Sequence, residues 1–232
     1  MKKTIMAFGA HPDDIELRCS GTLIKLAQRG HKIIAVDLTQ GDRGTRGTPQ
    51  KRLEEANKSL KIMGLDIREN LKIPDTNIQK NEENKLKVIN IIRKYRPDVI
   101  FLPYWDDKHP DHLHSSYLIS EASFYSGLKN IKTDYESFRP IYNVYFMCHY
   151  TFQPTFIVDI SDIFQIKLKA IKAYKSQFKD DKKKISPKSP FYLENFLAQD
   201  RFYGSIIGVK YGEPFLLKNP IETENPINLL FS

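Results

Sequence analysis

The stretch AFGAHPDDIEL, residues 7–17, joins the end of an apolar run to a histidine, a proline and two aspartates. The run that leads into it, residues 4–9, is bounded by lysine and by a His-Pro break, and it has the unbroken apolar character of a buried parallel strand. His11, Asp13 and Asp14 are therefore expected at the carboxyl end of that strand. In open parallel sheets, ligands bind at this end.

A second apolar run ends in a cluster of the same kind. Residues 99–103 are apolar and continue directly into YWDDKHPDHLH, residues 104–114. The tripeptide His-Pro-Asp thus occurs twice, at residues 11–13 and 109–111, each time at the end of an expected strand. Because parallel strands present their carboxyl ends at one edge of the sheet, both clusters are expected on the same rim.

The rest of the chain alternates strands and helices. Thr48 and Pro49 have the residue types of an N-cap and a first helical position, and Gly64 is a typical helix end. Further strands are expected at residues 33–38, 71–73, 142–147 and 156–160, and further helices at residues 16–28, 84–95, 161–178 and 192–202. This order predicts an α/β fold, a Rossmann-like, mostly parallel sheet with helices on both faces, as a single domain over residues 1–232.

Composition narrows the class of protein. The 232 residues are 41% hydrophobic, enough for one sizeable core, and the two cysteines are too few for a disulfide framework. No cleavage site follows the first apolar stretch and no segment is long enough to cross a membrane, so a cytoplasmic protein is expected. The formal net charge is +8, but the densest basic stretch, residues 182–184, resembles a solvated loop. We therefore expect neither a membrane nor nucleic acid as a partner.

The residue types in the two clusters suit metal-assisted hydrolysis. Zinc in hydrolytic sites takes three imidazole or carboxylate ligands and keeps one position for water, and His11, Asp14 and His112 supply such a set. Asp13 would act as the general base. His109, oriented by Asp111, would stabilise the developing oxyanion or protonate the leaving nitrogen. Imidazole with carboxylate suits Fe²⁺ as well as Zn²⁺, so both metals stay open.

A less specific interpretation is that each cluster is only a turn that caps the next helix. For a single such string the capping turn is the better interpretation, but two copies at matching positions favour the metal site. His114 is expected on a helix surface. His149 has no acidic residue near it in the sequence and is expected to be structural or exposed.

At these residues the sequence resembles the LmbE/PIG-L family of zinc-dependent N-acetylglucosamine deacetylases, which share AHPDD-x-E, a following Gly-Thr, and HPDH. The matching positions are residues 10–16, 21–22 and 109–112. Within that family the chain looks most like the deacetylases of bacillithiol biosynthesis, which act on N-acetylglucosaminyl malate. The strings that carry this second resemblance are residues 37–56, 149–161, 173–178 and 201–215.

The resemblance implies a function and a set of site residues. It assigns the metal to His11, Asp14 and His112, the base to Asp13, and a supporting pair to His109 and Asp111. Further substrate contacts that it suggests are Arg46, which would hold the malate carboxylates, Arg43 in the same loop, Lys108 at a position where arginine is usual, and Tyr192, Glu194 and Tyr203.

The expected activity is therefore removal of the acetyl group from N-acetylglucosaminyl malate, a small acidic glycoside. The alternatives are another N-acetylglucosamine-containing substrate, such as a chitooligosaccharide or an antibiotic precursor, or a non-enzymatic protein that binds polyanions through the +8 charge. Relatives often assemble, so a homo-oligomer is consistent with the resemblance.

Overall fold

The computed structural model describes residues 1–178 and 192–222. Within these ranges seven strands form one sheet in the order β3-β2-β1-β4-β5-β7-β6. Neighbouring strands from β3 to β5 run parallel, whereas β7 runs antiparallel to both β5 and β6. The strands are β1 (Thr4–Gly9), β2 (Lys32–Asp37), β3 (Ile67–Asn70), β4 (Val99–Pro103), β5 (Tyr142–Phe146), β6 (Phe156–Asp159) and β7 (Gly212–Leu217).

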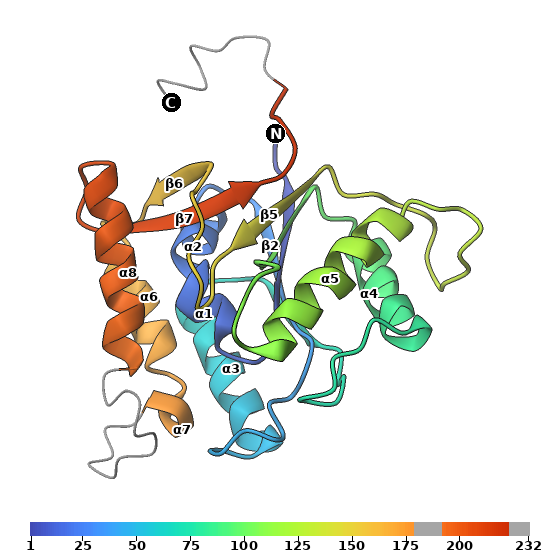
Figure 1. Cartoon of the computed structure of the whole chain (residues 1–232), viewed down its shortest axis with the longest axis horizontal. Coiled ribbons are helices and arrows are strands. Elements are labelled where there is room, and N and C mark those ends of the chain that lie inside the picture. Colours follow the sequence, from blue (N-terminus) through green and yellow to red (C-terminus); the bar gives the residue numbers. More distant parts are fainter. Residues whose placement is uncertain (179–191, 223–232) are drawn as a thin grey trace.

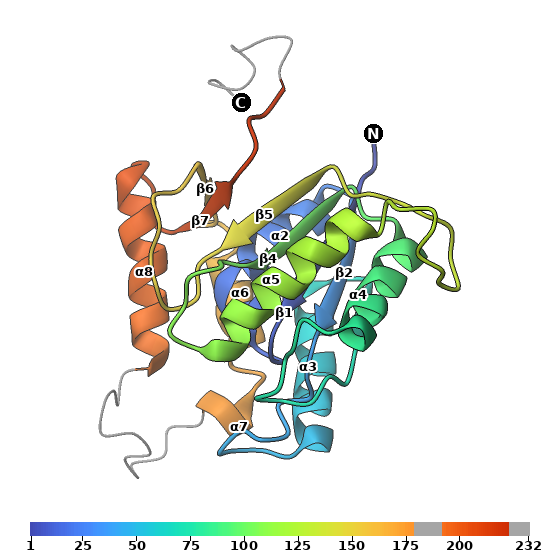
Figure 2. The same cartoon turned by 45° about the vertical axis from the view of Figure 1, so that its right-hand side comes forward.

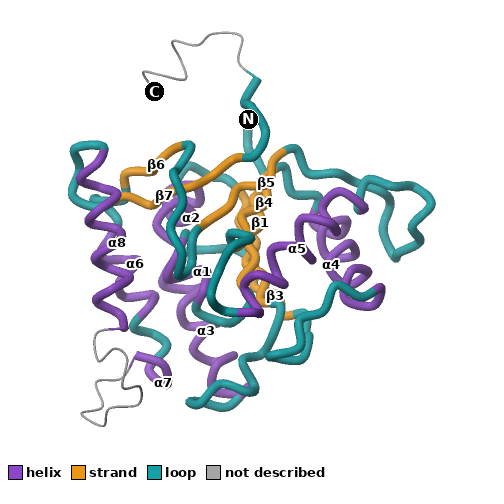
Figure 3. Tube along the Cα trace, viewed as in Figure 1, coloured by secondary structure: helices purple, strands orange, loops and turns teal. Residues whose placement is uncertain are grey.

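Helices cover both faces of this sheet (Figures 1 and 3). Ile5 and Ala7 of β1 pack in one core cluster with α1, α2, α3 and α6, whereas Met6 and Phe8 pack in a second cluster with α4 and α5. This alternation follows from the two-residue period of a strand. The helices are α1 (Asp14–Arg18), α2 (Ser20–Gln28), α3 (Pro49–Met63), α4 (Glu82–Tyr95), α5 (Pro110–Tyr125), α6 (Phe164–Ile171), α7 (Lys175–Phe178) and α8 (Tyr192–Ile206).

The predicted fold class is confirmed, and several elements differ from the predicted ones. The strand expected at residues 71–73 is wrong, because β3 occupies residues 67–70. The helices expected at 16–28 and 161–178 are each divided in two, the first at Cys19, whose backbone is not helical. The sequence pattern gives no range for α5, although His114 is expected on a helix surface, and it does not predict β7. The predicted ends of β1 and β4 are confirmed.

The strand order creates a topological switch point at the carboxyl end of the sheet. β2 lies on one side of β1 and β4 on the other, so the chain crosses from one side of β1 to the other between β3 and β4. Such a switch point is the usual ligand site of open α/β sheets. Figure 2 shows α8 standing beside β6 and β7, away from α4 and α5. No helix in the described ranges has the length and apolar character that spanning a bilayer requires.

A buried ion cluster ties β7 to the helices α2, α6 and α8. Glu213 of β7 accepts hydrogen bonds from the main-chain N–H groups of Gly21 and Thr22, in the first turn of α2. The Lys167 ammonium of α6 lies 2.9 Å from Glu213 Oε1 and 2.7 Å from Asp200 Oδ2 of α8. Lys167 and Glu213 are completely buried. The cluster thus joins α2, α6, α8 and β7.

Replacing Lys167 by methionine is expected to lower the free energy of unfolding by at least about 3 kcal/mol, because two buried carboxylates lose their shared counter-charge. Urea unfolding at pH 7 measures this. The control is Lys25→Met, which breaks the pair with the exposed Asp162 and is expected to change stability by less than about 1 kcal/mol. Equal losses in the two variants would contradict the role of the cluster.

Candidate active site

The loops after β1 and β4 hold the two His-Pro-Asp clusters in one place. The first loop is a tight turn, in which Asp14 Oδ2 accepts a hydrogen bond of 2.9 Å from the main-chain N–H of His11. Gly9 permits this turn, since a Cβ there would lie 3.0 Å from the His11 carbonyl oxygen and 3.1 Å from Asp14 Cβ. In the second loop, His109 is the N-cap of α5 and Pro110 its first residue.

Asp14 lies between two imidazoles, that of His11 in the loop after β1 and that of His112 in the first turn of α5. Its Oδ2 is 3.6 Å from His11 Nδ1, and its Oδ1 is 3.3 Å from His112 Nε2. All three side chains are buried. Each offers a ligand atom, and these three atoms lie within 4.8 Å of one another.

The far nitrogens of both imidazoles face carboxylates. His11 Nε2 lies 3.1 Å from Asp75 Oδ1 and 3.2 Å from Asp111 Oδ2. His112 Nδ1 lies 3.2 Å from Asp107 Oδ1. A metal-binding histidine nearly always donates its other N–H to such a partner, which fixes its tautomer and strengthens it as a ligand. His11, Asp14 and His112 therefore fit a divalent metal such as zinc.

The carboxylates of the cluster favour positive charge on the neighbouring imidazoles. Burial would lower the pKa of His11, but hydrogen bonds with Asp111, Asp14 and Asp75 raise it well above its ordinary value. Burial would raise the pKa of Asp14, yet His112 and His11 hold it well below its usual range. Imidazoles in such surroundings bind either protons or a metal ion.

Two other groups of side chains share these residues. His11, His109 and Asp111 form one, and Asp107, His112 and His149 form the other. In both groups the carboxylate already accepts main-chain hydrogen bonds, Asp111 from Thr76 and Asp107 from His109 and His149. We interpret them as the hydrogen-bonded surroundings of the ligand set, not as further metal sites.

His109 is a neutral hydrogen-bond donor beside the ligand set. Burial and the charges of His112 and His11 lower the pKa of its ring. Its Nδ1 accepts the main-chain N–H of Asp111 at 3.2 Å, so the proton of the neutral ring is on Nε2. The expected support of His109 by Asp111 is thus made by the Asp111 main chain, whereas the Asp111 carboxylate faces His11 and Thr76.

Asp13 is held in a strained backbone conformation by Arg52. Its φ of 119° lies in the left-handed region that favours glycine. The guanidinium of Arg52 donates to the Pro12 carbonyl oxygen and lies 3.2 Å from Asp13 Oδ2. Burial raises the pKa of Asp13 to about 7 in spite of Arg52, with Asp14 and Glu16 adding to the rise. A carboxyl that titrates near neutrality suits proton transfer at pH 7.

A glycine-containing loop after β2 encloses Arg52. Gly41 has a φ of +64°, and a Cβ there would lie 2.5 Å from Arg52 Nη1, so only glycine fits. The loop also reaches the ligand set, because the main-chain N–H of Arg43 donates to Asp75 Oδ2 at 2.9 Å while Asp75 Oδ1 faces His11. The loop therefore contacts Arg52, which holds the proposed base Asp13, and Asp75, which faces the proposed metal ligand His11.

A second set of buried, hydrogen-bonded side chains supports the first turn of α1. The Arg68 guanidinium forms two bonds of 2.7 Å with Asp37 at the end of β2 and one of 2.6 Å with Glu16. The Tyr174 hydroxyl donates to the same Glu16 oxygen at 3.0 Å. Glu16, the last residue of the AHPDD-x-E string, therefore ties the metal loop to β2, β3 and the segment after α6.

The structure brings six predicted residues together, namely His11, Asp13, Asp14, His109, Asp111 and His112. The residues predicted to contact the substrate differ in how far they are exposed. Arg43, Lys108 and Glu194 are exposed, Arg46 is half-buried with its carbonyl bonded to Gln177, and Tyr203 is buried within α8. The side chain of Tyr192 lies outside the described residues.

Four residues of the site escape prediction: Arg52, Asp75, Asp107 and His149. His149, expected to be structural or exposed, has an acidic partner that is distant in the sequence, since its Nδ1 lies 2.8 Å from Asp107 Oδ1. Asp75, Asp107 and His149 follow the carboxyl ends of β3, β4 and β5. The rule that ligands bind at the carboxyl ends of parallel strands therefore applies to these three residues as well. Arg52 lies within a helix and gives no such signal.

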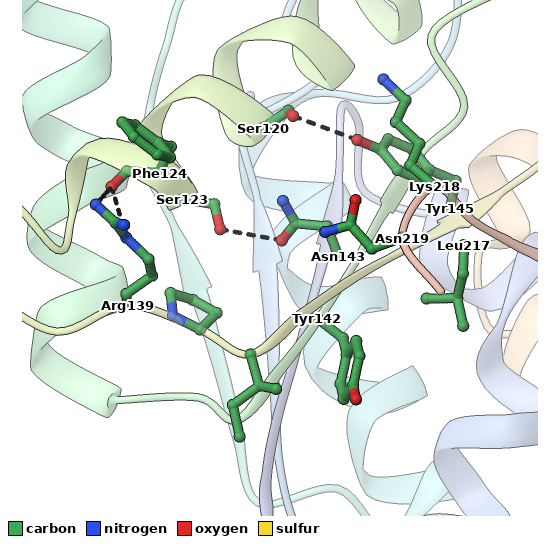
Figure 4. Close-up of a pocket in the computed structure, with 12 residues that line it drawn as sticks. Ser120, Ser123, Phe124, Arg139, Tyr142, Asn143, Tyr145, Leu217, Lys218 and Asn219 are labelled. Atoms are coloured by element: carbon green, nitrogen blue, oxygen red, sulfur yellow. Dashed lines mark hydrogen bonds between the residues drawn. The ribbon is translucent and has the colours of Figure 1, made fainter. Parts of the chain in front are cut away.

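A separate pocket of about 290 Å³ lies between α5, β5 and the end of β7 (Figure 4). Its wall includes Ser123, which bonds to Asn143, and Ser120, which bonds to Tyr145. Tyr142 and Asn143 stand at the amino end of β5, opposite to the rim that carries the His-Pro-Asp loops. The pocket is therefore distinct from the candidate active site.

The fold and the cluster define an α/β protein with a buried His/Asp centre of the kind that holds a divalent metal in hydrolases. Comparison with known proteins identifies the family. The PIG-L family, described as GlcNAc-PI de-N-acetylase, matches residues 6–123. The diacetylchitobiose deacetylase of Thermococcus kodakarensis is 30% identical over 225 residues, which cover 91% of this chain and 81% of that protein.

Two solved structures extend the similarity over almost the whole chain. The conserved protein TT1542 from Thermus thermophilus superposes with a TM-score of 0.87 at 35% identity, covering 95% of this chain and 97% of that one. The N,N'-diacetylchitobiose deacetylase from Pyrococcus horikoshii, in complex with its inhibitor, gives 0.81 at 29% identity, covering 93% and 83%. The chain belongs to the PIG-L family of de-N-acetylases.

The contact between Arg52 and Asp13 can be tested by a double-mutant cycle on stability at pH 8, with chelator present. At that pH, above the Asp13 pKa of about 7, the carboxylate is charged. Arg52→Met and Asp13→Asn are expected to couple by about 1–3 kcal/mol, because each variant alone leaves a buried partner unpaired.

The control pair replaces the neighbouring Lys51, which pairs with the exposed Glu54, by methionine. Lys51→Met combined with Asp13→Asn should be additive to within about 0.5 kcal/mol. Additivity in the Arg52 cycle as well would contradict the contact.

Proposed function

We propose that this protein is a zinc-dependent hydrolase that removes the acetyl group from N-acetylglucosaminyl malate, the substrate of the bacillithiol-biosynthesis subgroup. The observation that carries the metal-dependent chemistry is the position of Asp14 between two imidazoles, each backed by a buried carboxylate. Membership of a de-N-acetylase family supports the reaction.

The residues of the chain have separate roles in this reaction. Zinc, when bound, lowers the pKa of a water molecule to about 7 and polarises a carbonyl group. Asp13 accepts the proton of the attacking water, and its raised pKa lets the same carboxyl pass that proton on. His109, with its proton on Nε2, donates a hydrogen bond to the carbonyl oxygen as that oxygen gains negative charge, or to the leaving nitrogen. Acetate and a free amine are the products.

The malate part of the proposal rests on positive charge beside the cluster. Arg43 and Arg46 belong to the loop that contacts Arg52 and Asp75, and Lys108 directly precedes His109. A guanidinium can hold a carboxylate with two parallel hydrogen bonds. An uncharged sugar substrate would form only weaker, neutral hydrogen bonds with these side chains.

A second candidate is deacetylation of a chitooligosaccharide. It is favoured by two relatives that are named as diacetylchitobiose deacetylases and are similar over most of this chain. Acetate release from N-acetylglucosaminyl malate and from diacetylchitobiose, measured side by side, decides between the two. The higher kcat/KM identifies the substrate class.

Asp13→Asn is expected to keep about one zinc per chain and to lose at least about 99% of the acetate release, because the amide cannot accept a proton. Zinc content by atomic absorption and acetate by enzymatic assay provide the two readouts. A chelator should abolish wild-type activity and added zinc should restore it. Turnover in Asp13→Asn near the wild-type rate would refute the role of Asp13.

Arg46→Ala is expected to raise KM for N-acetylglucosaminyl malate about tenfold or more and to leave KM for N-acetylglucosamine methyl glycoside nearly unchanged, because only the first has carboxylates. Steady-state kinetics on the two substrates measure the difference. The matched control is Lys51→Ala, an exposed cation on α3 for which both KM values should equal those of wild type. A parallel rise on both substrates in Arg46→Ala would show that Arg46 does not recognise malate.

A further inference from the structure

His149 is fixed beside the candidate metal ligands by its own set of contacts. It belongs to the segment between β5 and β6, where its main-chain N–H donates to Asp107 Oδ2 at 2.7 Å. Its ring Nδ1 lies 2.8 Å from Asp107 Oδ1. The carbonyl group of the preceding residue, Cys148, accepts a hydrogen bond from the buried Arg18. These contacts hold both the peptide unit that precedes the His149 Cα atom and the imidazole ring itself.

These contacts determine which ring nitrogen is free. Asp107 also accepts the main-chain N–H of His109 at 2.8 Å and faces His112 Nδ1, so its carboxylate acts only as an acceptor. His149 must then donate from Nδ1, which leaves the neutral ring with an acceptor lone pair on Nε2. Asp107 is almost completely buried, whereas 13% of the His149 side chain is exposed.

His109 has the opposite tautomer and stacks on the same ligand. The His109 and His112 rings lie 4.7 Å apart and 19° from parallel, and the His112 and His149 rings lie 5.3 Å apart and 15° from parallel. A ring with a hydrogen-bond donor at Nε2, His109, and a ring with an acceptor at Nε2, His149, thus both stack on His112.

We propose that His149 binds the substrate, with Nε2 accepting a hydrogen bond from a hydroxyl or N–H group of the sugar that carries the acetamide. An acceptor suits a sugar hydroxyl and repels a carboxylate, so His149 recognises the sugar ring and not the malate. The proposal rests on the proposed function, in which His109 donates a hydrogen bond to the acetamide. A saccharide that lacks the matching hydroxyl should bind less well.

Long-range ¹H–¹⁵N NMR on the zinc-loaded protein tests the tautomers without any assay of activity. His149 is expected to have its proton on Nδ1 and His109 on Nε2. Titration with N-acetylglucosamine should shift the ¹⁵N signal of His149 Nε2. A His149 proton on Nε2, or no shift at saturating sugar, would overturn the proposal whether or not the protein is a deacetylase.

Two substitutions separate sugar binding from support of the metal ligand. His149→Asn keeps an N–H donor for Asp107 and loses the acceptor at Nε2, whereas His149→Gln places an amide oxygen near the Nε2 position. For an N-acetylglucosamine substrate, His149→Asn is expected to lower kcat/KM about tenfold, and His149→Gln should recover most of it. Zinc affinity should stay unchanged in both variants.

The control is His114→Asn, which alters an exposed histidine of α5 and should leave kcat/KM at the wild-type value. Equal kcat/KM for His149→Asn and wild type would refute sugar binding. Weakened zinc affinity in both His149 variants would assign His149 to the support of His112 through Asp107. If wild type releases no acetate from any N-acetylglucosamine substrate, the proposed function fails and the NMR titration alone decides the role of His149.

Discussion

The position of Asp14 between the imidazoles of His11 and His112 is the constraint on which the whole site depends. Its carboxylate contacts imidazoles from the loops after two strands, and those imidazoles in turn face Asp75, Asp107 and Asp111. Four carboxylates in a buried space repel one another unless positive charge lies among them. Protons on the two imidazoles or one divalent cation can provide that charge. The same arrangement thus accounts for the raised pKa of His11 and for the fit to a metal.

The sheet makes this arrangement possible because the histidines and aspartates of the site follow the carboxyl ends of strands. β1 leads to His11 and Asp14, β3 to Asp75, β4 to Asp107 and His112, and β5 to His149. Arg52 differs, since it reaches the loop from a helix and holds the strained turn at Asp13. Rigid strands thus place the ligands, while a buried guanidinium fixes the acid/base group.

The sequence predicts those parts of the site that are local. The His-Pro-Asp strings follow clear apolar runs, so six residues could be assigned to one rim before any contact was known. Asp75, Asp107 and His149 become partners only through the strand order, which periodicity does not reveal. Strand β7 escaped prediction because Pro214 stands within it, and proline is unusual inside a strand. The break at Cys19 escaped because apolar spacing continues across it from Leu17 to Leu23.

The contact of Glu213 with the first turn of α2 also has a consequence for the order of assembly. The metal loop leads through α1 into α2, yet the carboxylate that anchors α2 follows Thr22 by 191 residues. On a ribosome, the first motif and the two helices after it therefore emerge long before this anchor does. Docking of β7 must then follow the synthesis of the metal loop, and it completes the support of the helix that follows the first motif.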